Sequence, residues 1–61
     1  MVIGSKVKIK PDKIHFYEGN RAPFADLTKT GKIYNILGDT AVVMFENIGI
    51  NVYKDDLCIV D

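Results

Sequence analysis

The sequence predicts a small all-β domain built from five short strands, and three observations support this prediction. Apolar and polar residues alternate with a period of two along much of the chain, as in strands with one buried face. No helical period persists for more than one turn. Turn-forming residues interrupt the apolar runs at short intervals. We therefore expect one domain over residues 1–61, a small five-stranded barrel with a long first loop and a 3₁₀ turn before the last strand.

The first strand is predicted over residues 6–10, where lysines at every second position share one face and Val7 and Ile9 share the other. Such alternation describes a strand with one buried side and one solvent-facing side. Pro11 and Asp12 end the strand, because proline cannot donate to a strand ladder and aspartate favours turns.

A long segment separates the first strand from the second. Residues 12–29 contain turn residues such as Gly19 and Pro23 together with several aromatic side chains. A loop of this length is unusual in a compact domain unless it is functional or folds back on itself. We expect an irregular hairpin, whose aromatic side chains close one end of the barrel or line its binding face.

Three further strands are predicted over residues 32–37, 40–45 and 50–53, of which 40–45 is apolar on both faces, as in a central strand. Residues 54–57 suit a single 3₁₀ turn, and residues 58–60 make a short closing strand. A bent, closed barrel would hide the strand edges that otherwise promote aggregation. The predicted core comprises Val7, Ile9, Ile33, Ile36, Ala41, Val43, Phe45, Ile50, Val52, Leu57 and Ile59.

Length and composition limit the classes of protein to consider. A chain of 61 residues has room for one domain with a small core, and Cys58, its single cysteine, excludes an internal disulfide. No segment reaches the roughly 20 apolar residues that span a bilayer, and the N-terminus lacks the apolar region of a signal peptide. We expect a soluble, cytoplasmic protein that makes no membrane contact.

Charge is unevenly distributed, although the formal net charge is zero. Residues 1–32 carry seven basic and three acidic side chains, whereas residues 33–61 carry one basic and five acidic ones. This pattern argues against binding of nucleic acid through total charge, and it leaves a local basic face open.

The strongest electrostatic feature is a row of lysines on and just after the first strand. One interpretation is a face for phosphates or for an acidic partner, with weak and salt-sensitive affinity. The other is that lysines on an edge strand prevent aggregation between sheets. Both interpretations concern the same side chains, which are Lys6, Lys8, Lys10 and Lys13.

A second candidate surface consists of aromatic side chains. Tyrosine and phenylalanine offer large, rigid contact area and are enriched at the centres of interfaces. Their alternative role is to cap a barrel too small to bury all of its apolar groups. With an arginine from the long loop, they form the predicted partner-binding set of Phe16, Tyr17, Arg21, Phe24, Tyr34 and Tyr53.

The sequence offers little for catalysis or metal binding. A thiol nucleophile needs a base within hydrogen-bond reach, and no spacing links Cys58 to His15 or Asp39. In its apolar strand Cys58 is expected to behave as a small hydrophobic residue. Asp55 and Asp56 suit a solvated turn better than a metal site. We therefore predict a protein that is not an enzyme, with no cofactor and no metal.

With its strands placed, the chain resembles SH3-like barrels. The similar segments are Gly-Ser-Lys-Val-Lys-Ile at residues 4–9, Gly-Lys-Ile at 31–33, the apolar run at 38–45 and Lys-Asp-Asp-Leu at 54–57. One branch that it resembles is the bacterial SH3 domain of phage endolysins and amidases, which binds cell walls. Another contains small free-standing barrels that dock on larger proteins, and KOW-type domains that contact RNA or RNA polymerase.

The missing catalytic groups and this resemblance together predict a binding module. The leading hypothesis is a small adaptor or regulatory protein, of the kind that phages and mobile elements encode, docking on a larger protein partner. Two alternatives stay open: a peptidoglycan-binding module of a phage lysin, and a KOW-like barrel that binds nucleic acid, which is the less favoured of the two.

Overall fold

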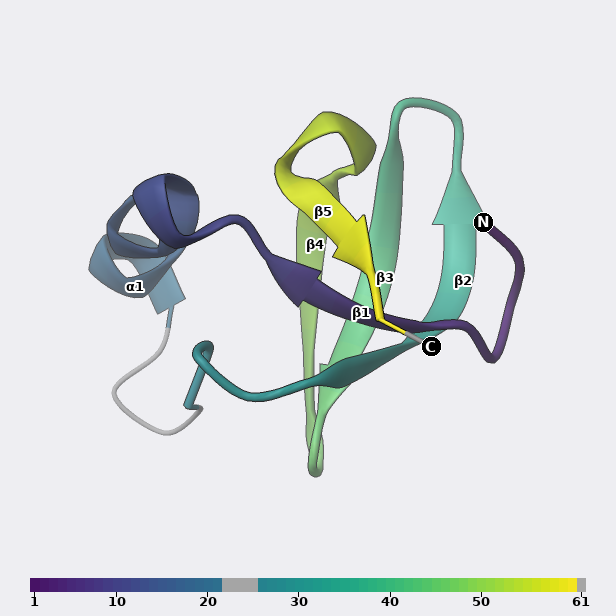
Figure 1. Ribbon diagram of the computed structural model, residues 1–61, viewed down its shortest axis with the longest axis horizontal. Helices are drawn as coiled ribbons and strands as arrows, with labels where there is room; N and C mark the ends of the chain where they lie inside the picture. Colours follow the sequence, from purple (N-terminus) through teal and green to yellow (C-terminus); the bar gives the residue numbers. More distant parts are fainter. Residues whose placement is uncertain (22–25, 61) are drawn as a thin grey trace.

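The computed structural model describes residues 1–21 and 26–60, and for residues 19–21 it describes the backbone alone. Five strands form one antiparallel sheet in the order β4-β3-β2-β1-β5 (Figure 1). The all-β class, with five strands and a 3₁₀ turn before the last, is thus confirmed. The elements in chain order are β1 (Lys6–Ile9), η1 (Pro11–Lys13), α1 (Ile14–Arg21), β2 (Gly31–Leu37), β3 (Thr40–Phe45), β4 (Ile48–Tyr53), η2 (Lys54–Asp56) and β5 (Leu57–Ile59).

The sheet is strongly bent, and strand β2 runs through the bend. Its first residues pair with β1 and most of its length pairs with β3, and in Figure 1 it turns from one direction into the other. The register with β3 shifts between Ile33 and Asn35, so that Tyr34 is one extra residue, a β-bulge. Bulges bend a strand and reset its alternation. Ile33 and Ile36 therefore both turn toward the core, although a regular strand would place them on opposite faces.

Strand β1 lies in the interior of the sheet, paired with β2 on one side and with β5 on the other. The free edges of the sheet are β4 and β5. The lysines of β1 therefore do not protect an edge, and that interpretation of the lysine row is wrong.

The inward faces of the strands form one hydrophobic core. Of the predicted core residues, all are buried except Ile36, which is half-buried, and Ile59, which is 51% exposed. The prediction for Ile59 is wrong because β5 is a three-residue edge strand with a neighbouring strand on one side only. Two buried hydrophobic side chains among the described residues were not predicted, Tyr17 and Leu27, and both belong to the long segment between β1 and β2.

The prediction of an irregular hairpin in that segment is wrong. Instead, Pro11 opens the 3₁₀ helix η1, which leads directly into α1. Ile14 and Tyr17, three residues apart, lie on one side of the helix and pack against the core. A helix of eight residues is marginal alone in water, so packing rather than propensity stabilises α1. A single pair of apolar residues at helical spacing is too short a pattern to identify a helix from the sequence.

The segment returns to β2 through a hydrogen-bonded turn. The Asp26 carboxylate accepts hydrogen bonds from the Thr28 backbone N–H (3.0 Å) and the Thr28 hydroxyl, and the Lys29 N–H donates to the Asp26 carbonyl (3.2 Å). The two hydrogen bonds from Thr28, first that of its hydroxyl and then that of its backbone N–H, hold the pKa of the Asp26 carboxyl below its usual value. Between these polar groups the side chain of Leu27 points into the core, where it is fully buried.

Candidate partner-binding groove

The beginning of the helical segment and the end of β4 enclose a groove of about 240 Å³. Two exposed aromatic side chains lie on it, Phe16 from α1 and Tyr53 from the last position of β4, and these are 54% and 55% exposed. Both were predicted to contact a partner, and the fold brings them to one surface. We call this surface the aromatic groove; its lining residues are Asp12, Lys13, His15, Phe16, Tyr53 and Asp56.

Tyr17 contacts both walls of the aromatic groove. Its hydroxyl donates to Asp56 Oδ2 in η2 (2.5 Å) and accepts a hydrogen bond from the Tyr53 backbone N–H (3.2 Å). Its ring packs edge-to-face against Phe16, with 5.0 Å between centroids. Tyr17 therefore links α1 to β4 and η2, and fixes where the two exposed rings stand.

Burial of the Tyr17 hydroxyl and its hydrogen bond to Asp56 raise its pKa to about 12, against a smaller opposing effect of the Tyr53 N–H. Tyr17 is only 5% exposed, so its side chain offers a partner little area and lies mainly in the core, unlike the exposed Phe16 and Tyr53. A tyrosine that can place its ring in a core and its hydroxyl on a polar group is readily buried.

Tyr34, another predicted partner residue, does not line the aromatic groove. Tyr34 is 67% exposed but lies at the bulge of β2, among residues that do not line this groove. Phe24 and the side chain of Arg21 lie outside the described part of the structure.

The lysine row is divided by the fold. Lys6 and Lys8 are exposed on the outer face of β1, whereas Lys10 is half-buried and its backbone N–H donates to the Asp56 carbonyl (2.8 Å). Lys13 lies in η1 and lines the aromatic groove. The sheet adds Lys32 of β2, which stands directly opposite Lys6 and was absent from the predicted row. Strand pairing could not be derived from the chain order, and this is why Lys32 was missed.

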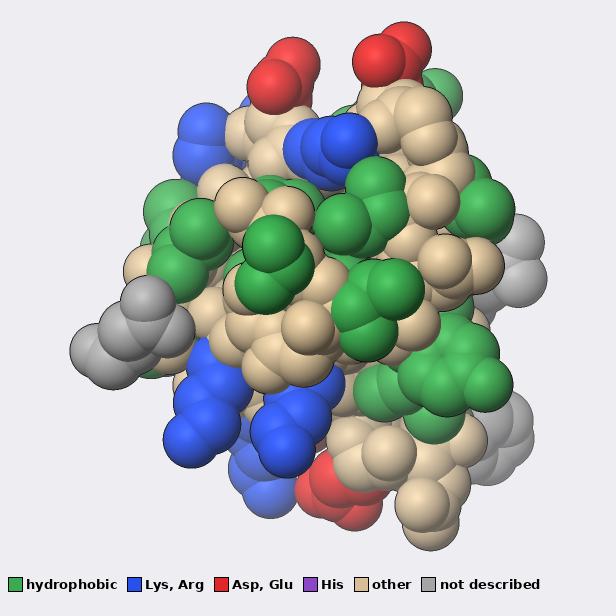
Figure 2. Space-filling view, turned by 90° about the vertical axis from the view of Figure 1, so that its right-hand side faces the viewer, with side chains coloured by type: hydrophobic (Ala, Val, Ile, Leu, Met, Phe, Trp, Pro, Cys, Tyr) green, Lys and Arg blue, Asp and Glu red, His purple; other side chains and the backbone are tan. Residues whose placement is uncertain are grey.

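Lys6 and Lys32 border a second, wide groove of about 610 Å³ that also touches Thr30, Gly31, Met44, Glu46 and Val60. Figure 2 shows the side of the molecule on which β2 and the N-terminal segment lie. Hydrophobic side chains gather across the centre of this side, and basic and acidic side chains both lie near its upper and its lower edge.

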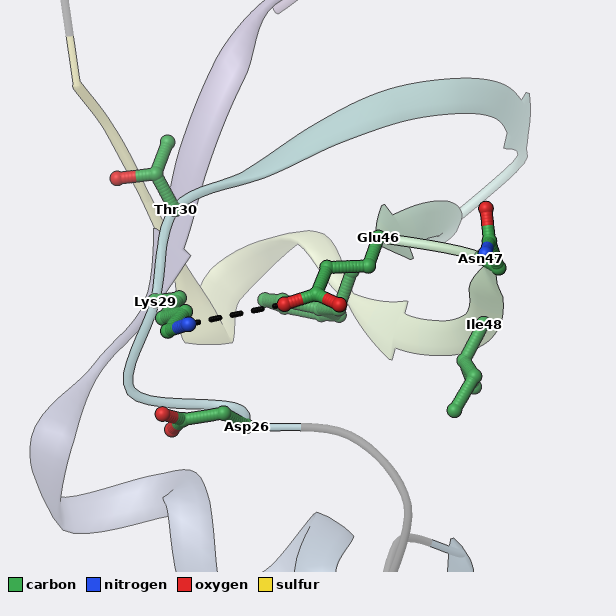
Figure 3. A pocket seen from close by; sticks show the side chains of 7 residues that line it. Asp26, Lys29, Thr30, Glu46, Asn47 and Ile48 are labelled. Atoms are coloured by element: carbon green, nitrogen blue, oxygen red, sulfur yellow. Dashed lines mark ion pairs between the residues drawn. The ribbon is translucent and has the colours of Figure 1, made fainter.

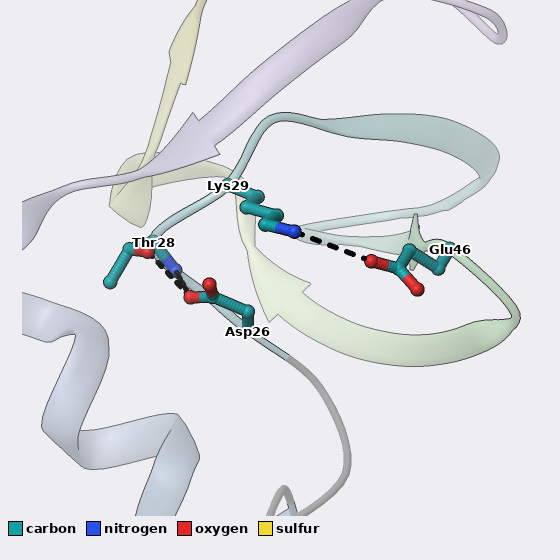
Figure 4. A network of polar contacts seen from close by, with 4 residues as sticks. All are labelled: Asp26, Thr28, Lys29 and Glu46. Carbon is teal, nitrogen blue, oxygen red and sulfur yellow. Dashed lines mark hydrogen bonds and ion pairs between the residues drawn. The ribbon is translucent and has the colours of Figure 1, made fainter.

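A third hollow, of about 310 Å³, lies where the turn before β2 meets the β3–β4 hairpin (Figure 3). Here Lys29 and Glu46 point toward each other, with 3.6 Å between Lys29 Nζ and Glu46 Oε1, and Asp26 lies below Lys29 in this view. Figure 4 shows that this ion pair stands beside the Asp26–Thr28 hydrogen bonds. Both partners of the ion pair are well exposed, so it contributes little to stability.

Cys58 does not behave as the small hydrophobic residue expected, since it is exposed on the edge strand β5. Among the described residues, no three His, Cys, Asp or Glu side chains cluster in a way that could hold a metal ion. Within the same ranges, no helix has the length and the apolar character needed to cross a bilayer.

Comparison with known proteins adds no relative: no family model, no curated protein and no solved structure matches this chain. The resemblance to SH3-like barrels therefore stays a prediction from the sequence.

Proposed function

We propose that this protein is a non-catalytic binding module that docks on a larger protein through the aromatic groove. The observation that carries the proposal is the placement of Phe16 and Tyr53 beside one concave surface, each with about half of its area in solvent. Exposed aromatic side chains around a hollow are typical of the residues that contribute most to protein interfaces.

The charges around the aromatic groove indicate the chemistry of the partner segment. Asp12 and Asp56 bring two carboxylates to the lining, and Lys13 brings one ammonium group. A cation gains from the carboxylates and also from the faces of the aromatic rings. The partner segment therefore combines an apolar side chain, placed between the two rings, with a lysine or arginine directed toward the carboxylates.

The hydrogen bonds of Tyr17 support this proposal, because they hold both walls of the aromatic groove before any partner arrives. A rigid surface loses less conformational entropy on binding than a mobile one, and the affinity rises accordingly.

A peptide-display selection against the purified domain tests the proposal. Selected peptides should combine an apolar or aromatic residue with a nearby basic residue. Phe16→Ala and Tyr53→Ala should each weaken binding of a selected peptide by tenfold or more, on the order expected for central interface residues. Tyr34→Ala is the matched control, since it removes an aromatic ring that is also exposed but lies outside the aromatic groove.

The proposal fails if no peptide is enriched, or if the enriched peptides bind the Phe16→Ala/Tyr53→Ala double variant as tightly as the parent. The cell-wall hypothesis makes a different prediction, namely that the domain sediments with purified peptidoglycan and that soluble peptides do not compete.

A further inference from the structure

The outer face of β1 and β2 carries a feature that protein docking at the aromatic groove does not use. Lys6 and Lys32 stand directly opposite each other on neighbouring antiparallel strands, and both are exposed. Like charges in this position destabilise a strand pair. Neither lysine forms an ion pair with a carboxylate among the described side chains. Because β1 and β2 are both interior strands, edge protection does not explain the pair.

Apolar groups flank the two lysines in register. Met44 of β3 stands opposite Lys32, and the Val60 backbone N–H donates to the Lys6 carbonyl (2.8 Å), so that Val60 continues the row on the other side. Both residues line the second groove together with the lysines, and both are half-buried. The groove therefore has a positive centre between two apolar ends.

Tyr34 supplies an aromatic ring on the same strand as Lys32, just beyond the residues that line this groove. It follows Lys32 by two residues, so strand alternation places both on the outer face of β2, and its side chain is 67% exposed. The N-terminal segment lies beside it, since the Gly4 N–H donates to the Ile33 carbonyl (2.8 Å) and the Ile33 N–H donates to the Ser5 carbonyl (2.9 Å). An exposed ring on the same strand face as Lys32 provides a surface on which a planar base can stack.

We propose that this face binds single-stranded nucleic acid, with Lys6 and Lys32 on phosphates and Tyr34 stacked on a base. Positive charge combined with an aromatic platform is the arrangement that recognises such strands. An acidic peptide would satisfy the lysines but would leave the aromatic ring without a planar partner, so nucleic acid is the occupant that the groove favours. This site is separate from the aromatic groove and is independent of the proposed function.

Glu46 sets a limit on the affinity. Its carboxylate lines the same groove and repels a phosphate, although the ion pair with Lys29 neutralises part of that charge. Glu46→Gln removes the repulsion and should tighten binding a few-fold, on the order expected for one nearby charge in a solvated site.

Fluorescence anisotropy with a labelled uridine oligonucleotide of about 12 nucleotides tests the proposal at several salt concentrations. Two phosphate contacts predict that the logarithm of the affinity falls with the logarithm of the salt concentration with a slope of about −1.4. Lys6→Gln and Lys32→Gln should each reduce that slope by about 0.7, because each removes one contact. Tyr34→Ala should weaken binding about tenfold without changing the slope.

Lys54→Gln is the matched control, since it makes the same change in net charge on η2, away from the lining of this groove. It should leave the slope unchanged. The proposal would be overturned if the parent protein did not bind the oligonucleotide at low salt. It would also be overturned if Lys32→Gln and Lys54→Gln reduced the salt slope by the same amount. A labelled poly-glutamate peptide that binds as tightly as the oligonucleotide, and that depends equally on Tyr34, would assign the face to an acidic protein and would also overturn it.

Discussion

Tyr17→Phe tests whether one hydroxyl fixes the helical segment on the sheet. The substitution keeps the ring, which is buried in the core, and removes the oxygen that contacts both Asp56 and the Tyr53 backbone. No cavity larger than one atom results, so the measured effect belongs to the two hydrogen bonds.

The expected loss follows from what each bond contributes. A hydrogen bond to a charged group contributes about 1.5–3 kcal/mol, and a part-buried N–H left without an acceptor costs up to a further 1 kcal/mol or so. We expect the free energy of unfolding to fall by about 2 kcal/mol. For a domain of this size the total is roughly 3–9 kcal/mol, so the loss is a substantial part of it, and Tm should fall by about 10 °C.

The pH dependence gives a second, independent readout. The pKa of Tyr17 is about 12 in the folded protein and lies near 10 in the unfolded chain. A raised pKa means that the folded state favours the protonated hydroxyl, so its contribution is complete below pH 10 and is lost as the pH rises toward 12. The difference in stability between the parent and Tyr17→Phe should therefore shrink across that interval.

Urea denaturation followed by circular dichroism at pH 7, and again between pH 9 and 12, measures both quantities. Tyr34→Phe is the matched control, because it removes the same atom from an exposed side chain and should change stability by less than about 0.5 kcal/mol. If Tyr17→Phe is as stable as Tyr34→Phe, or if its difference from the parent does not vary with pH, the role assigned to the hydroxyl is wrong.

Three further substitutions test other parts of the fold by the same measurement. Leu27→Ala should lower stability by about 2–4 kcal/mol, because Leu27 is fully buried; a loss below about 1 kcal/mol would contradict its place in the core. Gly31→Ala should cost about 1–3 kcal/mol, since a Cβ would stand 2.6 Å from Val43 Cγ1 and 3.0 Å from the Met44 carbonyl oxygen, and a neutral result would contradict this packing. Glu46→Gly should stabilise by about 1 kcal/mol, because Glu46 has a φ of 58° in the β3–β4 turn; a loss of stability would show that its ion pair outweighs the strain.

The aromatic groove illustrates how much of a site the sequence reveals. Phe16 and Tyr53 could be chosen from residue type alone, since aromatic side chains in loops and on outward strand positions are candidates for any interface. That these two side chains lie on one surface could not be predicted, because it depends on α1. This helix has only one pair of apolar residues at helical spacing, which is too short a pattern to identify a helix from sequence. Tyr17 was assigned to the partner surface for the same reason, since only the docking of the helix decides which of two adjacent aromatic residues faces the core.

The sequence by itself determined the all-β class, the five strands and nearly all of the strand core. Where apolar and polar residues alternate with a period of two, the pattern indicates directly which side chains face inward. Only the tertiary structure decided how the strands are ordered, and therefore that the lysines of β1 lie in the middle of the sheet and meet Lys32. It also decided that the segment after β1 is helical and places Tyr17 and Leu27 in the core. Strand order and helix docking are set by contacts between residues far apart in the chain. A local sequence pattern does not reveal such contacts.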